Sequence, residues 1–516
     1  MEEKAKILSS LLAGLLGITG VLAWKIMDIL PIRVFPSARG GEDGLVERPR
    51  GRISSTAEWE SIVLSPDGRR VAYIAQDAKK QWVIVDGKPG RKYDRVMGGS
   101  LCFSPDGRHF AYTAQVGEQW LVVVDGKEGK RYDGINTSPT FSPDGAHLAH
   151  GVRLGEERFV LVDGKPEGRR YDFLGGFILY SPDGKRLAYT AQIGEEWLAV
   201  IDGRETERYD EFKNILFSPD GRRHAYAVRT GKKQLVVVEG KEGKLYDGVL
   251  DGTPIFSPDG RRVAYGAREG SKRFVVVDGE EGKAYEAIGK GTLSFSPNGR
   301  HLAYAAKARG KWLVVLDGRE GQPYDGIGTR IVFSPDGKRV AYPARLGGKW
   351  LVVLDGEEGR PYDAIGGGTP IFSPDGRHLA YVAFVGERQL VVVDERPGKD
   401  YDGIVEGTLA FSPDGREVVY AAQRGEEQLV VRGGGEEKPY EAIGSVPFFS
   451  PDGGYLAYTA LKDGKWRVVV NQKEGHPYDA VIVDTKSFFH LEDRSVHYLG
   501  LRRNKLYAVE EKGLLD

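Results

Sequence analysis

The sequence contains few of the residues that mark the common kinds of site. Its single cysteine, Cys102, cannot form an intramolecular disulfide, and one thiol cannot build a zinc–cysteine cluster. Cys102 precedes Phe103 at a position where the repeats described below mostly carry aliphatic residues, so we expect it in a core strand and not at a reactive site. Lys and Arg number 73 against 74 Asp and Glu, so no net basic field is available to attract nucleic acid.

The common motifs of catalysis and cofactor binding are also missing. The sequence has no Gly-x-Ser-x-Gly, no His-Glu-x-x-His, no Gly-x-x-x-x-Gly-Lys-[Ser/Thr] and no Asp-x-Asp-x-Asp-Gly. No acid, base and nucleophile stand out together. The sequence therefore predicts no enzyme, no cofactor and no metal site.

One short motif dominates the chain. Ser-Pro-Asp-Gly, once written Ser-Pro-Asn-Gly, returns eleven times at intervals of 37 to 39 residues. An unbroken period of this size predicts a repeat architecture. The copies begin at Ser65, Ser104, Ser142, Ser181, Ser218, Ser257, Ser296, Ser334, Ser373, Ser412 and Ser450.

Each repeat has the pattern of four short strands. In one typical repeat, the apolar residues 369–372 run into the turn Ser373–Gly376, where Pro presets φ, Asp bonds its own backbone and Gly accepts a positive φ. Two apolar segments follow, at 378–383 and 389–393, and the repeat closes on Tyr401-Asp402. Many repeats also carry Asp-Gly after the third segment, which is a hairpin signal. Four antiparallel strands per repeat predict one blade of a β-propeller.

From about residue 57 the chain resembles the WD-repeat-like propellers of the TolB type. The resemblance rests on the core Phe-Ser-Pro-Asp-Gly-x-x-[Leu/Val]-Ala-Tyr, which is nearly intact in eleven copies. It implies an all-β propeller fold and a role as a binding platform, or in some relatives as a domain beside a hydrolase. No added hydrolase domain is expected, because the repeats fill the chain.

The N-terminal part has a different composition. Ile7–Trp24 is a run of 18 residues without a charge, bounded by lysines, and is just long enough to cross a bilayer as a helix. We expect residues 1–30 to be an uncleaved signal-anchor, with a cleaved signal peptide as the alternative. The flanking charges hardly set the orientation, and the propeller is expected on the periplasmic or extracellular side. Residues 31–49 read as a linker and residues 50–516 as the repeat array.

After the eleventh copy the pattern weakens but persists. Residues 489–493 replace the turn motif, and residues 495–498 and 505–509 match a second and a third strand, but no fourth strand follows. We therefore expect twelve blades in a single ring, with residues 50–56 completing the last blade and covering its bare edge. Two six-bladed rings are the alternative, although the repeat spacing shows no seam between them.

Several recurring positions are expected to be structural. The acidic residue after each closing Tyr should accept hydrogen bonds from neighbouring backbone. His150 replaces a Tyr found in the other ten copies, and a tolerated substitution is the favoured interpretation. Histidines just after the turn should face solvent, at His109, His147, His224, His301 and His378. Tryptophans that open third strands should pack between blades, at Trp82, Trp120, Trp197, Trp312, Trp350 and Trp466.

One difference between repeats follows the order of the chain. Blades 7, 8, 10 and 11 carry Pro just before the closing Tyr, whereas blades 1 to 4 carry basic residues there. This pattern predicts a basic outer rim in the N-terminal half as a candidate interaction surface, with drift among duplicated blades as the alternative. The rim residues are Arg91, Lys92, Lys130, Arg131, Arg169, Arg170 and Arg208.

These features predict a membrane-anchored, non-enzymatic propeller that binds or scaffolds other proteins, as an accessory subunit of a membrane complex. The expected partners are proteins and, through the N-terminal helix, the membrane, without nucleic acid. The alternative is a propeller enzyme or a carbohydrate-binding module with its site in the mouth of the ring.

Overall fold

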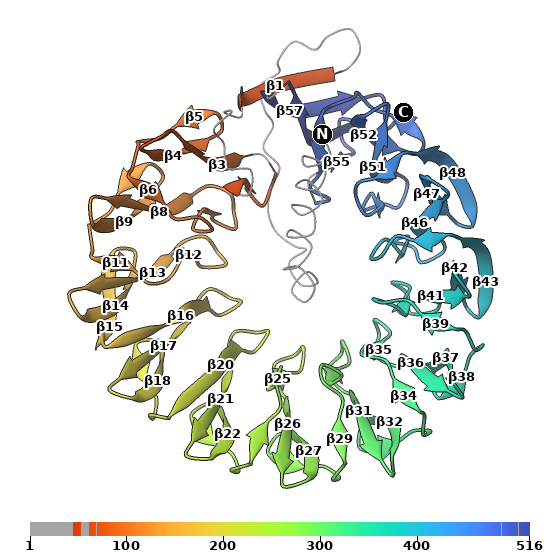
Figure 1. Cartoon of the computed structure of the whole chain (residues 1–516), viewed down its shortest axis with the longest axis horizontal. Coiled ribbons are helices and arrows are strands. Elements are labelled where there is room, and N and C mark those ends of the chain that lie inside the picture. Colours follow the sequence, from red (N-terminus) through yellow and green to blue (C-terminus); the bar gives the residue numbers. More distant parts are fainter. Residues whose placement is uncertain (1–44, 53–60, 69, 487, 504) are drawn as a thin grey trace.

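In the computed structural model, twelve antiparallel sheets follow one another in a closed ring (Figure 1). The structure describes residues 45–52, 61–68, 70–486, 488–503 and 505–516. Each sheet is one blade, and the blade of the C-terminal strands lies beside the first blade. The predicted all-β propeller, with twelve blades in one ring, is confirmed.

The expected membrane anchor, Ile7–Trp24, lies outside the described residues. Within the parts of the chain that the structure describes, no helix combines the length and the apolarity needed to cross a bilayer.

The second and third strands form the centre of every blade. The second strands are β3 (Val71–Gln76), β8 (Phe110–Val116), β13 (Leu148–Leu154), β17 (Leu187–Ile193), β21 (His224–Thr230), β26 (Val263–Glu269), β31 (Leu302–Ala308), β36 (Val340–Leu346), β41 (Leu379–Val385), β46 (Val418–Arg424), β51 (Leu456–Lys462) and β56 (Ser495–Arg502). The third strands are β4 (Gln81–Val85), β9 (Gln119–Val124), β14 (Glu157–Val162), β18 (Glu196–Ile201), β22 (Lys233–Val238), β27 (Lys272–Val277), β32 (Lys311–Leu316), β37 (Lys349–Leu354), β42 (Arg388–Val393), β47 (Glu427–Arg432), β52 (Lys465–Val470) and β57 (Lys505–Lys512).

The first strand of each blade lies nearest the central opening (Figure 1), and in most blades it is split into two short segments. These strands are β2 (Val63–Leu64), β6 (Arg95–Val96) with β7 (Cys102–Phe103), β11 (Gly134–Ile135) with β12 (Thr140–Phe141), β16 (Phe173–Tyr180), β20 (Glu211–Phe217), β24 (Gly248–Val249) with β25 (Ile255–Phe256), β29 (Ala287–Ile288) with β30 (Ser294–Phe295), β34 (Gly326–Ile327) with β35 (Val332–Phe333), β39 (Ala364–Ile365) with β40 (Ile371–Phe372), β44 (Gly403–Ile404) with β45 (Ala410–Phe411), β49 (Ala442–Ile443) with β50 (Phe448–Phe449), and β54 (Ala480–Ile482) with β55 (Phe489–His490).

The fourth strand forms the outer edge of each blade (Figure 1). These strands are β5 (Lys88–Pro89), β10 (Lys127–Glu128), β15 (Lys165–Tyr171), β19 (Arg204–Glu205), β23 (Lys241–Glu242), β28 (Glu280–Glu281), β33 (Arg319–Glu320), β38 (Glu357–Glu358), β43 (Arg396–Tyr401), β48 (Gly435–Tyr440), β53 (Lys473–Glu474) and, in the last blade, β1 (Leu45–Arg52). Asp125 and Gly126 between β9 and β10 both have a positive φ, as the predicted two-residue hairpin turn requires.

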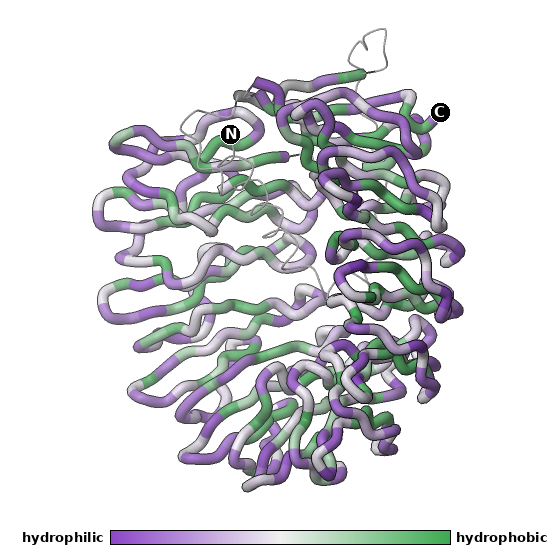
Figure 2. Tube along the Cα trace, turned by 45° about the vertical axis from the view of Figure 1, so that its right-hand side comes forward, coloured by the Kyte–Doolittle hydropathy of each residue, from purple (hydrophilic) through white to green (hydrophobic). Residues whose placement is uncertain are grey.

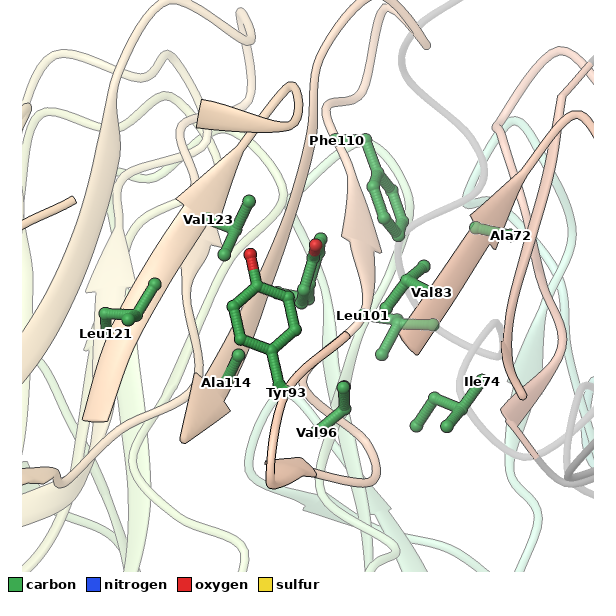
Figure 3. Packing of buried hydrophobic residues seen from close by; sticks show 11 residues of the cluster. Ala72, Ile74, Val83, Tyr93, Val96, Leu101, Phe110, Ala114, Leu121 and Val123 are labelled. Carbon is green, nitrogen blue, oxygen red and sulfur yellow. The ribbon is translucent and has the colours of Figure 1, made fainter. Parts of the chain in front are cut away.

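Apolar side chains hold the blades together face to face. Hydrophilic residues are concentrated at the turns and hydrophobic ones within the strands (Figure 2). Figure 3 shows the seam between the first two blades, where Ala72, Ile74 and Val83 of one blade face Val96 and Phe110 of the next. Alternation along each strand places one set of residues on each sheet face, so every blade contributes to two such cores.

Pairs of tyrosines recur at these seams. The Tyr that ends one blade meets the Tyr in the second strand of the next, edge to face, as Tyr93 does with Tyr112. Ten of the eleven seams between consecutive blades have this pair, with ring centroids 5.8–6.5 Å apart. Edge-to-face pairs stabilise by about 0.5–1.5 kcal/mol beyond burial of their area. The exception is the seam of blades 2 and 3, where the second Tyr is replaced by His150.

The N-terminal strand closes the ring. β1 pairs antiparallel with β57, so the last blade gains its fourth strand from the start of the described chain. Glu47 faces Val509 in the same register as Glu358 faces Val353 in blade 8. Tyr478 donates a hydrogen bond to Glu47 at 2.6 Å, as fourth-strand glutamates accept from tyrosines in other blades.

The closing strand begins earlier than the sequence suggested. β1 spans residues 45–52, so residues 45–49, which the sequence assigned to a linker, belong to the propeller. Of the expected closing segment, 50–56, residues 50–52 lie in β1 and the rest lie outside the described residues. The strand contains no Tyr-Asp, and its position is instead marked by the single glutamate at 47.

Candidate functional site

The repeated turn satisfies its own polar groups. In blade 9, the Ser373 hydroxyl donates to Asp375 Oδ1 at 2.5 Å, and the same carboxylate oxygen accepts from the Arg377 N–H at 3.0 Å. The Ser373 oxygen also accepts from the N–H of His378 at 3.0 Å. Gly376 has φ +71°, a conformation that glycine adopts without strain. In this copy the Ser and Asp side chains therefore serve to hold the turn.

The recurring histidines form a second structural clamp. His378 Nδ1 lies 2.6 Å from Asp394 Oδ2, and the other oxygen of that carboxylate accepts from the Leu379 N–H at 2.9 Å. In blade 10 the charges are exchanged, because Glu417 pairs with Arg432 at 2.8 Å. The expected solvent-facing structural role is confirmed for four of the five histidines, whose side chains are 41–51 % exposed. His224 also pairs with an acid, Glu239, but it is only 12 % exposed, so the expectation that it faces solvent is wrong.

The acidic residue after each closing Tyr links neighbouring hairpins. Asp94 accepts from Lys80 Nζ of blade 1 at 2.7 Å and from the Gly117 N–H of blade 2 at 2.8 Å. The Lys80 ammonium and the Gly117 N–H hold the pKa of the Asp94 carboxyl below its usual value. The expected bond to neighbouring backbone is confirmed.

The tryptophan row is less buried than expected. Trp350 is half-buried, whereas Tyr381 in the next blade is fully buried. Each Trp opens a third strand directly after an exposed hairpin turn, so one side of the ring stays near solvent. Lys92 Nζ lies 4.4 Å from the centre of the Trp82 ring. The large side chains that fill the seams are tyrosines.

The basic rim lies on the exposed outer edge, but most of its charges are neutralised. Five of its seven cations form ion pairs: Arg91 with Glu128, Lys92 with Asp77, Arg169 with Glu205, Arg170 with Glu157, and Arg208 with Glu196. Lys130 and Arg131 are exposed and have no carboxylate partner among the described residues. Within the predicted basic rim, the cations without such a partner thus lie side by side on blade 2.

The blades differ most along their inner strands. Between the two segments of the first strand, a short loop borders the central opening. In blade 7, Thr292 donates to the Gly289 carbonyl at 2.8 Å and accepts from the Ala305 N–H at 3.0 Å. Equivalent hydroxyls bond the second strand at Ser100, Thr137, Thr369, Thr408 and Ser445. In these six blades a hydroxyl thus anchors a loop whose other residues vary from blade to blade.

Charged side chains of three consecutive blades pair with one another along the inner edge. Lys213 of blade 5 lies 3.8 Å from Asp251 of blade 6, and Lys290 of blade 7 lies 3.7 Å from the same residue. The carboxylate is well exposed, so these pairs contribute little stability. They give this arc of the opening a charged border.

Blade 4 instead presents apolar side chains. Phe177 is 87 % exposed and Leu179 is 38 % exposed, both on β16. The strand bulges between Leu174 and Ile178, whose side chains are buried. A Cβ on Gly175 would lie 1.8 Å from the Thr190 hydroxyl, so the bulge requires glycine. The backbone is therefore shaped in a way that leaves Phe177 in solvent.

His150 is the one buried histidine with an unpartnered nitrogen among the described residues. It is 7 % exposed, and no hydrogen-bond partner contacts its Nδ1. Burial lowers the pKa of His150 to about 4. Tyr132, which would pair with a Tyr at this position, packs on Phe159 instead. The residue is a neutral imidazole inside a seam, out of reach of solvent.

Comparisons with known proteins find weak similarities to solved structures. No protein-family model and no curated protein matches the sequence. Similar solved structures include a eukaryotic initiation factor, with 13 % identity over 72 % of this chain and 96 % of that one, at a TM-score of 0.30. TolB from Acinetobacter baumannii matches with 20 % identity over 43 % of this chain and 61 % of that one, at a TM-score of 0.22. The propeller domain of the Trilobed protease from Pyrococcus furiosus matches with 17 % identity over 52 % of this chain and 98 % of that one, at a TM-score of 0.25.

Sequence reasoning missed the exposed inner strand of blade 4. The signal was present, because Phe177 stands where most other repeats carry Ser or Thr in the inner loop, as at Ser100 and Thr369. This signal lies where other blades have the loop between the two halves of the first strand, outside the repeated core.

Proposed function

We propose that the protein is a non-enzymatic binding platform that holds a protein partner at its central opening, with the inner strand of blade 4 as the contact. The observation that carries the proposal is Phe177, an almost fully exposed aromatic ring on a strand that borders the opening. Burying such a side chain contributes about 1.5–3 kcal/mol to association. Leu179 on the same strand extends the apolar contact.

The anchor and the location of the ring complete this proposal. The apolar run Ile7–Trp24 would hold the protein in the membrane as a signal-anchor, and the ring would stand on the periplasmic or extracellular side. Carbonate washing should leave the protein in the membrane fraction, and protease added outside spheroplasts should cut the ring. A mature protein that starts after residue 24 and is soluble would contradict the anchor.

Affinity purification from native membranes tests the contact. Phe177→Asp should abolish co-purification of the partner, because a carboxylate would have to be buried in its place. Val385→Asp is the matched control, since Val385 is a 51 % exposed apolar residue of blade 9 that lies at a hairpin turn. Retention of the same proteins by both variants would contradict the proposal. If only binding to a glycan array changes, the ligand is a carbohydrate.

The unpaired cations of blade 2 are a second contact of the same platform. Reversing both charges in Lys130→Glu and Arg131→Glu should weaken association with an acidic partner. The effect should shrink as salt rises, because exposed charges are screened over about 8 Å at physiological ionic strength. Arg169→Glu is the control, since Arg169 is already paired with Glu205 at 2.5 Å. If the charge-reversed variant associates as well as the parent protein at low salt, the basic residues of the rim are explained by drift among duplicated blades.

A further inference from the structure

Blade 12 departs from the repeat at four positions that meet in space. In register with the other blades, His490 replaces the turn serine and Asp493 replaces the turn glycine. His497 replaces an alanine that is fully buried in blade 2 as Ala111, and Glu510 replaces an aliphatic residue of the third strand. Apolar and turn-forming positions have thus become metal-ligating residue types, all in one blade.

These side chains belong to the seam that closes the ring. Leu499 and Leu506 pack against Val71 and Tyr73 of blade 1. His497 precedes Leu499 by two residues and so lies on the same face of β56. Every other seam is built from consecutive blades, and this one joins the two ends of the array.

Three of the side chains bring ligand atoms close together. One ligand atom from each of Asp493, His497 and Glu510 lies within 4.8 Å of the other two. Ser495 donates to Asp493 Oδ1 at 2.7 Å and lies 3.0 Å from His497 Nε2. The His490 ring stacks on the His497 ring with centroids 3.7 Å apart. Asp493 is exposed, and the other two are half-buried, so the cluster is open to solvent on one side.

The cluster combines charges that a divalent ion can bridge. Lys512 Nζ is 3.9 Å from Glu510, at the limit of an ion pair. A divalent ion bound between two carboxylates and an imidazole favours the ionised form of both carboxylates.

We propose that Asp493, His497 and Glu510 bind a divalent transition metal, Zn²⁺ foremost, at the closing seam. Nitrogen and carboxylate donors lie about 2.0–2.2 Å from Zn²⁺, which places the donors about 3–4 Å from one another. The observed spacing needs only a small side-chain rotation to reach that. Imidazole favours zinc, nickel or cobalt over Mg²⁺ and Ca²⁺, which take oxygen donors.

Metal at this position would stabilise the blade that receives the closing strand. His497 lies on β56 and Glu510 on β57, and β57 is the strand that pairs with β1. An ion that binds only the folded cluster stabilises the folded state by mass action. The site thereby stabilises the hairpin of blade 12 to which β1 is added.

Titration of the full-length protein in detergent tests the site. After treatment with chelator, ZnCl2 should bind with one equivalent per chain in calorimetry, and CoCl2 should give the visible absorption of a low-symmetry nitrogen and oxygen site. Zn²⁺ should also raise the unfolding temperature. His497→Ala should remove the cobalt band, and Glu510→Gln should weaken zinc binding by about tenfold or more.

The control is a histidine–carboxylate pair at the corresponding end of blade 7. His301 Nδ1 lies 2.6 Å from Asp317, without a third ligand, so His301→Ala should leave the stoichiometry and affinity unchanged. Glu510→Gln is nearly isosteric and decides the case if His497→Ala does not fold. Binding of well under one equivalent, or equal losses in the His301 and His497 variants, would overturn the proposal.

Discussion

Replacing His150 with tyrosine should make the propeller less sensitive to acid. The imidazole is buried at the seam of blades 2 and 3, where its Nδ1 has no partner. Burial lowers its pKa from 6.5 to about 4. The unfolded chain therefore binds the proton more tightly than the folded one. Above pH 6.5 this group does not reduce the unfolding free energy. As the pH falls from 6.5 toward 4, protonation of the unfolded chain lowers the unfolding free energy progressively.

The size of this effect follows from the two pKa values. At pH 5 the unfolded state gains about 2 kcal/mol relative to the folded state from this one group, and at pH 4 about 3 kcal/mol. At pH 7 the contribution is close to zero. His150→Tyr removes it, and also restores the edge-to-face contact with Tyr132 that ten other seams possess, which adds about 0.5–1.5 kcal/mol.

Urea denaturation at pH 7 and pH 5, followed by tryptophan fluorescence, gives the measurement. The difference in unfolding free energy between His150→Tyr and the parent protein should grow by about 2 kcal/mol between the two pH values. Groups common to both proteins cancel in this difference. If the parent protein and His150→Tyr lost the same unfolding free energy between pH 7 and pH 5, the assignment of a buried neutral imidazole would be refuted.

Other consequences of the structure can be tested in the same way. Arg48→Cys with Ala508→Cys, in a Cys102→Ala background, should form an intramolecular disulfide detectable by mass, because the two residues are antiparallel partners about 4.5–5.5 Å apart at Cα; purely intermolecular crosslinks would contradict ring closure. Burial raises the pKa of the Cys102 thiol to about 12, so iodoacetamide at pH 8 should modify it far more slowly in the folded than in the unfolded protein, and equal rates would show the side chain to be accessible. Tyr381→Ala should lower the unfolding free energy by about 3–5 kcal/mol and half-buried Trp350→Ala by clearly less, so a reversed order in urea denaturation would mean that the seam is misassigned.

The period of the motif was enough to predict the blades. Ser373, Asp375 and Gly376 form a turn whose chemistry is local, so it can be read from any copy. The roles of His378 and Asp94 were also predictable, because each recurs at one position and can be judged by what replaces it. Repetition provides the comparison that a single globular domain lacks.

Burial between blades was harder to predict than the blades themselves. Trp350 and Tyr381 look equally apolar in sequence, but their exposure depends on where the neighbouring hairpin turn lies. The partners of the basic rim come from other strands and blades, as with Arg91 and Glu128, 37 residues away. Such contacts follow from the stacking of sheets, which one repeat does not encode.

The closing seam was the least predictable part, and the reason is general. Eleven near-identical repeats form near-identical seams, so each turns the chain by a similar angle and the ring closes where those angles complete a circle. The twelfth seam must accept whatever fit results, and it joins the first full repeat to a blade in which the repeat pattern is weakened. Glu47 reproduces the fourth-strand glutamate without the motif around it, and the cluster at Asp493, His497 and Glu510 replaces apolar packing there. Because this seam must fit two unlike ends, its residues have to depart from the repeat pattern. New ligand residues can therefore arise at this seam without changing the packing of the other blades.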